Sequence, residues 1–408
     1  MNFYNLKKII YPIVFIQLGT FLEYFDLMLY IHMASLLNQI FFSAEDSISS
    51  QLLLAFAFCS TFIFRPFGAI IFGYIGDNVG RKSVIILTMI IMAFTSITMA
   101  ILPTYSQIGV IASFMVTLCR ILQGVSSTGE KIAADLYLTE TTKPPSRYFI
   151  VSLSGVFAAL GTSCAIFAVY LINWYQFNFR ILFWLGGLIA IMALLIRIKT
   201  KESPEFLNAT KTSQKVETDY KYKAMWSYFA IDSVWPIVFY LVYIYFAILL
   251  QDNFQYSLKD ITLHNFILSL IELVSLILMS IATYKVFPLK ILKVKLYFFL
   301  LFVIFCPYIM PLLDSPIKIM FMQIYILIFA PTSFPAAAIF FIHFPIKKRF
   351  TYTSLMNSLS RALIYPLTAF GLIYIINIWG YSGLSVVLFI SCVFFGLGLR
   401  YFEKLTKE

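Results

Sequence analysis

Four ionisable side chains lie near the middle of long apolar runs in the first third of the chain: Glu23, Asp26, Arg65 and Arg120. A central charge in a lipid bilayer costs about 2.5–3.5 kcal/mol on insertion scales, so such residues are expected to pair or to line a wet cavity. Because two of them are acidic and two are basic, we expect a mutually paired polar interior.

Glu23 and Asp26 are three residues apart, which places both carboxylates on one face of a helix. Two carboxylates at this spacing compete for one proton, and a nearby Arg opposes that protonation. The pattern therefore favours reversible proton binding. The alternative is a static ion pair that only fixes the packing of helices.

Further ionisable residues fall in other apolar runs. Glu130 and Lys131 come at the end of one run, where a Lys side chain can reach water at the membrane surface. For these two a structural role and a chemical role are both open. In the second half the candidates are Asp232, Glu272 and Arg361. Glu272 and Arg361 are the deepest, and the sequence leaves open whether they meet.

The elements that must hold these residues are transmembrane helices. The chain of 408 residues is 61% hydrophobic and only 12% charged, with a mean hydropathy of +0.88. Soluble domains have about 25% charged residues, so most of the surface must face lipid. About twenty apolar residues of helix cross a membrane, and we count twelve such runs, approximately at 10–40, 51–76, 83–102, 106–131, 147–172, 177–199, 225–250, 261–285, 291–313, 316–343, 351–377 and 380–402.

The basic residues between these runs predict the orientation. Lys and Arg gather in alternate connections, and only Arg180, Lys259 and Lys318 lie in connections on the other side. By the positive-inside rule both termini are then cytoplasmic. The longest polar stretch follows the sixth run. We therefore predict an all-α membrane protein of two six-helix bundles, residues 1–199 and 224–408, joined by a cytoplasmic linker at 200–223.

The prolines, cysteines and histidines indicate less about function than the buried charges do. The sequence PTSFP at residues 331–335 predicts a bend, because broken helices are tolerated at membrane depth where they line a cavity; a packing kink without a function is the alternative. The five cysteines lie singly in separate apolar runs, and the three histidines lie near run ends, so we expect no metal or cofactor. The net charge of +11 comes from scattered residues and does not indicate nucleic-acid binding.

The connection between the second and third runs carries the sequence GYIGDNVGRK at residues 73–82. It resembles the cytoplasmic signature of the major facilitator superfamily. Glycines such as Gly73 and Gly80 allow a tight turn there, Asp77 can cap or pair across the bundle interface, and Arg81 can bind carboxylates. The resemblance implies a conformational latch for the outward-open state. Asn78 departs from the usual basic residue, which weakens part of that latch.

Four further segments resemble the metabolite:proton symporter family, whose members carry proline, betaine, dicarboxylates, citrate or shikimate. They are GTFLEYFD (residues 19–26), FRPFG (64–68), RILQGVSSTGE (120–130) and ESPEF (202–206). The resemblance covers roughly residues 15–206. It implies proton symport, a pathway lined by the first, fourth, seventh and tenth spans, and candidate site residues Glu23, Asp26, Arg65, Arg120 and Glu130.

Beyond residue 206 the resemblance thins. The loop ATYKVFPLK at residues 282–290 lacks a second copy of the signature, although FPIKKR at 344–349 resembles the family's basic entry to the eleventh span. This divergence keeps open a transporter-like receptor that does not transport. An exporting antiporter is disfavoured, because the fifth span (SGVFAALGTS, 154–163) lacks a Gly-Pro motif. An enzyme or an ion channel is disfavoured because neither a catalytic constellation nor a filter sequence is visible.

These patterns lead to one expectation. The chain is a proton-coupled importer of a small polar metabolite or osmolyte in the inner (plasma) membrane, in contact with lipid and functional as a monomer. Glu23 and Asp26 handle the proton, while Arg65 and Arg120 orient a carboxylate-bearing or zwitterionic solute. The sequence does not identify that solute.

Overall fold

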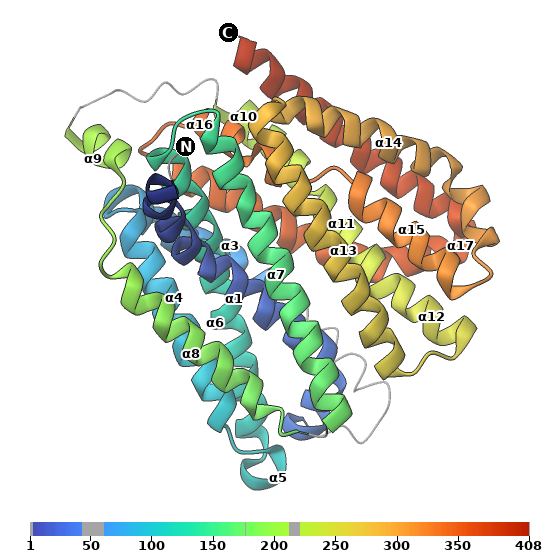
Figure 1. Cartoon of the computed structure of the whole chain (residues 1–408). Helices are drawn as coiled ribbons and strands as arrows, with labels where there is room; N and C mark the ends of the chain where they lie inside the picture. Colours follow the sequence, from blue (N-terminus) through green and yellow to red (C-terminus); the bar gives the residue numbers. More distant parts are fainter. Residues whose placement is uncertain (1–2, 43–60, 176, 212–220, 408) are drawn as a thin grey trace.

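The computed structural model describes residues 3–42, 61–175, 177–211 and 221–407, and within these ranges the regular structure is helical throughout (Figure 1). The helices of the first part are α1 (Phe3–Phe41), α3 (Arg65–Asn78), α4 (Arg81–Ile101), α5 (Tyr105–Ile108), α6 (Val110–Thr141), α7 (Ser146–Tyr175), α8 (Arg180–Arg197) and α9 (Pro204–Lys211). Those of the second part are α10 (Lys221–Asp232), α11 (Val234–Phe239), η1 (Tyr240–Tyr245), α12 (Phe246–Phe254), α13 (Leu258–Lys285), α14 (Pro288–Ile309), η2 (Met310–Leu312), α15 (Pro316–Phe329), η3 (Phe334–Ala336), α16 (Ala337–Ile342) and α17 (Arg349–Lys407).

The distribution of side chains confirms the prediction of a membrane protein. Large apolar residues such as Phe67, Tyr308 and Phe321 are mostly exposed, whereas the ionisable side chains of the helix interiors are buried. Among the described residues, nine helices are long and apolar enough to cross a membrane. The other three predicted spans coincide with α3, α14 and the first part of α17, although the beginning of the span at 51–76 lies outside the described residues.

Two predicted interruptions are confirmed. The backbone at Gly380 has φ 60° and ψ −153°, a conformation that side chains other than hydrogen strongly oppose. It divides the long helical stretch α17 into two helices, at the predicted boundary between the last two spans. In the tenth span α15 ends at Phe329, the single turn η3 follows, and α16 begins only at Ala337. The PTSFP segment is therefore a break in the helix.

The seventh span contains an interruption that the sequence does not predict. Between α11 and α12 the chain forms the π-helical turn η1. Such turns leave backbone carbonyls without their usual helical partners, and here side chains of neighbouring helices supply them. Gln323 donates to the Val242 carbonyl at 2.8 Å, and Asn265 donates to the Tyr243 carbonyl at 3.4 Å. Turns of this kind occur frequently at functional sites.

The helices of the two parts of the chain meet along two lines. α7 packs against α13 over much of its length, and α3 packs against α17 (Figure 1). Within the parts, α1 packs against α7, α4 against α8 and α10 against α17. The buried charges of α1, α3 and α6 thus lie close to the surface on which the two parts of the chain face each other.

Candidate functional site

The predicted charged residues of α1, α3 and α6 surround one small void. Glu23, Asp26, Arg65 and Arg120 all line it, and its volume is only about 10 Å³. Glu23 and Arg65 form a direct ion pair, with Arg65 Nη1 3.2 Å from Glu23 Oε1 and both side chains buried. The structure therefore brings together four residues that the sequence places in three separate spans.

Asp26 and Arg120 are arranged differently from Glu23 and Arg65. Within the described part of the chain no basic side chain lies within 4 Å of the Asp26 carboxylate, which accepts hydrogen bonds from Ser96 and from Gln123, each at 3.3 Å. Arg120 donates to the other end of Gln123 at 2.9 Å and to Thr61 at 3.2 Å. An uncharged amide therefore separates this acid from this base.

Glu130 lies in a second polar layer of the same bundle. Its carboxylate pairs with Arg197 at 2.6 Å and accepts a hydrogen bond from Thr88 at 2.6 Å. Arg197 also donates to the Phe15 carbonyl of α1 at 3.0 Å. A Cβ atom on Gly19 would lie 1.6 Å from a Glu130 oxygen, so only glycine allows α1 to pass this close.

One expectation about this layer is wrong. Lys131 does not extend to the membrane surface: only 4% of the residue is exposed, and its Nζ lies 3.8 Å from Asp135. The reason is that α6 continues to Thr141, ten residues beyond the predicted end of the span, so Glu130 and Lys131 lie inside the helix. Arg197, which lies in the predicted span at 177–199, is fully buried.

In the second part of the chain Asp232 is held by uncharged donors. Ser333, Asn357 and Ser360 donate to its carboxylate at 2.7–2.9 Å. Asp232 ends α10, Ser333 precedes η3, and the other two donors lie on α17, so one carboxylate joins the seventh, tenth and eleventh spans. Arg361 also lies on α17, and it interacts electrostatically with Asp232.

Glu272 and Arg361 are both buried but belong to different clusters. Glu272 of α13 accepts a hydrogen bond from the Tyr243 hydroxyl of η1 at 2.5 Å. Lys295, which lies in the predicted span at 291–313, is buried in α14, and its Nζ lies 3.7 Å from the Met279 sulfur. Among the described residues no ion pair within 4 Å forms between Lys295 and Glu272.

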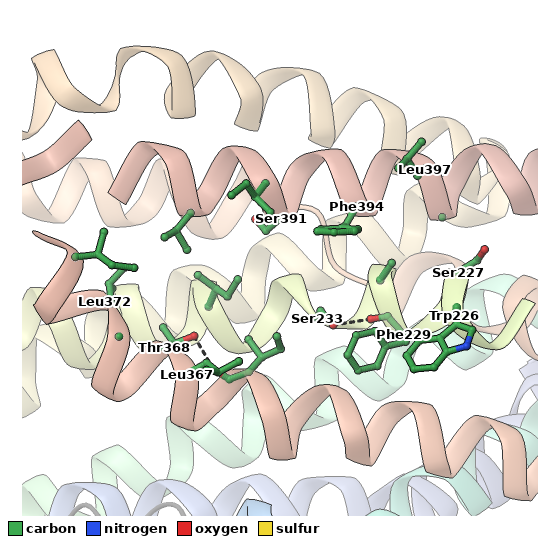
Figure 2. Close-up of a pocket in the computed structure, with 18 residues that line it drawn as sticks. Trp226, Ser227, Phe229, Ser233, Leu367, Thr368, Leu372, Ser391, Phe394 and Leu397 are labelled. Atoms are coloured by element: carbon green, nitrogen blue, oxygen red, sulfur yellow. Dashed lines mark hydrogen bonds between the residues drawn. The ribbon is translucent and has the colours of Figure 1, made fainter. Parts of the chain in front are cut away.

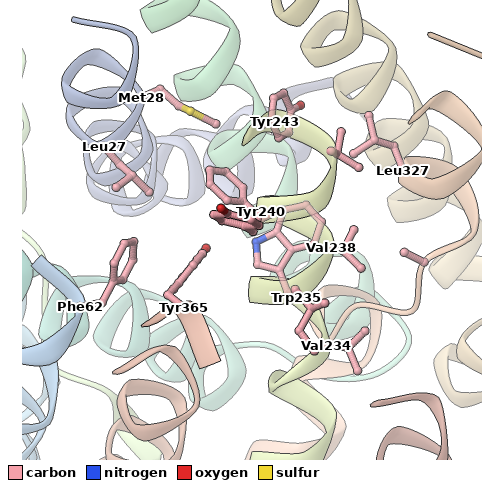
Figure 3. Close-up of a cluster of buried hydrophobic side chains, with 14 of the residues drawn as sticks. Leu27, Met28, Phe62, Val234, Trp235, Val238, Tyr240, Tyr243, Leu327 and Tyr365 are labelled. Atoms are coloured by element: carbon pink, nitrogen blue, oxygen red, sulfur yellow. The ribbon is translucent and has the colours of Figure 1, made fainter. Parts of the chain in front are cut away.

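Arg361 instead faces the first part of the chain. Arg65 of α3 and Arg361 of α17 interact electrostatically with each other and with the same three groups, Glu23, Tyr24 and Tyr365. Tyr365 stacks on Phe62, with ring centroids 4.0 Å apart (Figure 3). The centre of the molecule therefore contains two guanidinium groups, one from each part of the chain, among aromatic side chains.

The signature loop forms a cap on the opposite part of the chain. The Asp77 carboxylate accepts hydrogen bonds from the backbone N–H groups of Phe350 and Thr351 at 3.0 and 2.9 Å, and from the Thr351 hydroxyl at 2.7 Å. These N–H groups belong to the first turn of α17, where backbone donors have no partner within the helix and a negative charge also interacts favourably with the helix dipole. A Cβ on Gly73 would come within 3.0 Å of Thr351, so glycine permits this approach.

Arg81 extends the same contact. It pairs with Glu140 at 2.9 Å and donates to the Ile346 carbonyl at 2.9 Å. Glu140 also pairs with Arg349 at 3.2 Å. Glu202 in turn accepts the backbone N–H groups of Arg81 and Lys82 and so caps α4. We refer to Asp77, Arg81, Glu140, Glu202 and Arg349 as the latch network.

Two larger hollows differ in character. A groove of about 700 Å³ between α10 and the two halves of α17 is lined by apolar residues such as Trp226, Phe229 and Phe394 (Figure 2). The described residues that line it include no ionisable side chain, and it opens on the lipid-facing surface. A vestibule of about 400 Å³ is lined by His32, Gln39, Tyr243 and Asn265, between α1 and the π-helical turn. Of these two, the vestibule is the one lined by Tyr243, whose hydroxyl donates to the buried Glu272.

Known proteins are similar in sequence to about half of this chain. The sequence profile of sugar (and other) transporters matches residues 13–228. A Staphylococcus aureus protein named as a proposed proline/betaine transporter is 34% identical over 52% of this chain and 47% of its own length. The inner membrane metabolite transport protein YhjE of Escherichia coli is 29% identical over 49% of this chain and 47% of its own length. The matched segment thus spans about half the length of these relatives.

Solved structures match almost the whole chain at low identity. The proton:xylose symporter XylE bound to 6-bromo-6-deoxy-D-glucose superposes with a TM-score of 0.79 at 15% identity, over 96% of this chain and 94% of that one. XylE in a partially occluded inward-open conformation gives a TM-score of 0.63. The fold is that of the major facilitator superfamily, and neither the relatives nor the fold are those of enzymes. The chain therefore belongs to the family of sugar (and other) transporters, as a multi-pass membrane protein.

Proposed function

We propose that this chain is a proton-coupled symporter that imports a small polar metabolite or osmolyte, such as proline, betaine or an organic acid, by alternating access. The relatives named for proline/betaine and metabolite transport support the class of solute. The observation that carries the proton coupling is the environment of Asp26. Its carboxylate is buried and bound by neutral groups, and burying such a charge is unfavourable unless it takes up a proton or gains a cation.

Glu23 and Asp26 then have separate roles. Glu23 is neutralised by Arg65, whereas Asp26 alternates between a protonated form and a charged form that Arg120 approaches when Gln123 moves. Glu130 and Arg197 hold α1 against α6 and α8 and support the proton site from behind. Arg65 and Arg361 orient the solute where the two parts of the chain face each other.

The latch network supports alternating access. We propose two six-helix bundles, residues 1–199 and 224–408, which rock about the central site and are joined by the linker at 200–223. The Asp77 cap and the Arg81–Glu140–Arg349 contacts cross between the bundles and close one end of the pathway, and we place this end in the cytoplasm together with both termini. Their release would open that end. We place the protein in the inner (plasma) membrane as a functional monomer.

Uptake into proteoliposomes tests the proposal. Full-length protein is reconstituted and given labelled proline, betaine, succinate or citrate, with and without an inward proton gradient. We expect one class of solute to accumulate only with the gradient, and the double variant Glu23→Gln/Asp26→Asn to lose that dependence. Uptake by the double variant with an unchanged pH dependence would contradict the assignment of the proton site, and binding without any exchange would indicate a receptor.

A further inference from the structure

A second small void lies apart from the Glu23–Arg120 cluster and also faces both parts of the chain. It is lined by Tyr24 of α1, by Trp235, Phe239 and Tyr243 of the seventh span, by Glu272 of α13 and by Phe334 of η3. Its volume is about 10 Å³, enough for about one water molecule. In this conformation the site is therefore contracted.

The walls of this void are aromatic. The ring centroids of Trp235 and Phe239 lie 6.3 Å apart, those of Trp235 and Phe334 6.2 Å, and those of Phe239 and Tyr243 5.4 Å. On the facing side α7 contributes small residues, and a Cβ on Gly155 would lie 3.1 Å from the Phe334 ring. Aromatic walls around a single carboxylate are the surroundings that bind quaternary and other substituted ammonium groups.

The carboxylate in this void has no cation bound to it. Glu272 is 6% exposed, and its hydrogen bond comes from the neutral Tyr243 hydroxyl. Lys295 interacts with it electrostatically, but no basic group among the described residues pairs with it within 4 Å. A buried carboxylate in this situation is stabilised by any cation that enters. A substrate ammonium group would supply that cation.

Two hydrogen-bond donors of the same void are also unused. The Tyr24 hydroxyl and the Trp235 indole nitrogen are buried without a hydrogen-bond partner among the described residues. In Figure 3 the indole nitrogen of Trp235 points toward the side on which Tyr365 lies. Buried unsatisfied donors are rare and costly, so each calls for an acceptor. Tyr24 also interacts electrostatically with Arg361, which makes an anionic acceptor the favoured one.

From these contacts, and resting on the transport function proposed above, we propose that this void is the subsite for the ammonium group of a zwitterionic substrate. Glu272 is its counter-ion, and Trp235, Phe239 and Phe334 are its walls. The carboxylate of the same substrate binds the Tyr24 hydroxyl, the Trp235 N–H and Arg361. Tyr243 lines both this void and the vestibule, so its movement away from Glu272 opens the route between them.

Betaine and its carbon isostere 3,3-dimethylbutyrate separate the two ends of the site, because they differ only in the positive charge. Binding of each is measured by calorimetry on the purified full-length chain. We expect the wild-type protein to prefer betaine, and Glu272→Gln to weaken betaine binding by about tenfold or more with little effect on the isostere. Phe334→Leu should act in the same direction, and Glu272→Asp should restore part of the preference.

One further variant tests the carboxylate end of the site, and another, far from the site, serves as a control. Tyr24→Phe keeps a ring but removes the hydroxyl donor, so it should weaken both ligands by the same factor and leave their ratio unchanged. Asp314→Asn removes an exposed acid that pairs with Lys318, and it should change neither.

The outcomes separate the two proposals. An unchanged ratio of betaine to isostere affinity in both Glu272→Gln and Phe334→Leu overturns the ammonium subsite and leaves the transport function standing. A wild-type protein that transports succinate but neither betaine nor proline also overturns the ammonium subsite and leaves the transport function standing. A wild-type protein that exchanges none of these solutes overturns the proposed function itself.

Discussion

At the scale of single residues, the contrast between Glu23 and Asp26 is the main result. Both carboxylates lie on one face of α1, yet Glu23 has a direct Arg partner whereas Gln123 separates Asp26 from Arg120. Spacing along a helix predicts the shared face. It does not predict which partner each acid meets, because that depends on how α3 and α6 are rotated against α1. Gln123, a neutral residue, gives no signal in the sequence.

The buried pair Glu130–Arg197 should contribute strongly to stability. Glu130→Gln leaves Arg197 buried without its counter-ion, and breaking a buried ion pair in this way costs about 3–5 kcal/mol. We expect the melting temperature of the purified protein to fall by several degrees. Glu403→Gln is the control, because it breaks the partly exposed pair with Lys293, and such pairs contribute about 0–1 kcal/mol. Equal melting temperatures for the two variants would contradict the structural role of Glu130.

At the scale of elements, side chains that cap helix ends form much of the latch network. Asp77 caps α17 from the other part of the chain, and Glu202 caps α4. The signature sequence predicts the Asp77 contact through its resemblance to a family. Glu140 and Arg349 were missed as partners, because contacts between the fourth and eleventh spans follow from the way the two parts of the chain pack together. The end of α6 was placed ten residues too early, since its last turns are polar.

Weakening the Asp77 cap should favour opening of the latched end. Asp77→Ala removes three hydrogen bonds and a charge at the start of α17, and a lost cap costs about 0.5–2 kcal/mol. A cysteine replacing Ser354, buried between α3 and α17, is then expected to react with maleimide several-fold faster in a background without native cysteines. Asn78→Ala on the same loop loses one local hydrogen bond and should leave the rate unchanged. A rate that does not rise in Asp77→Ala would argue against the latch.

Gly380 should be required for the turn between the last two helices. Its positive φ with ψ −153° is accessible essentially to glycine, so Gly380→Ala is expected to cost roughly 1–3 kcal/mol and to lower the melting temperature. A Cβ there meets no atom within 4 Å, so the effect comes from the backbone alone. Gly371→Ala is the matched control, because that site is equally open but helical, and it should be neutral or slightly stabilising. A neutral Gly380→Ala would show that the turn does not depend on glycine.

At the scale of the whole molecule, apolar runs and the basic residues between them were sufficient to predict a helical membrane protein. Nine described helices reach membrane length, and the break at Gly380 and the PTSFP segment fall where expected. The sequence could not predict which side chains meet at the centre of the molecule. Arg65 and Arg361 are 296 positions apart, and they come together only because α3 docks on α17. The second part of the chain, most of which lies beyond the residues 13–228 matched by the sequence profile, supplies half of this site.

Proton movement coupled to the solute tests the central claim most directly. Proteoliposomes containing the full-length chain and an internal pH-sensitive dye receive the transported solute from outside, with no imposed gradient. We predict that the interior becomes acidic as the solute enters, and that Glu23→Gln/Asp26→Asn abolishes this change. Solute entry with no change in internal pH, or with an alkaline change, would contradict proton symport.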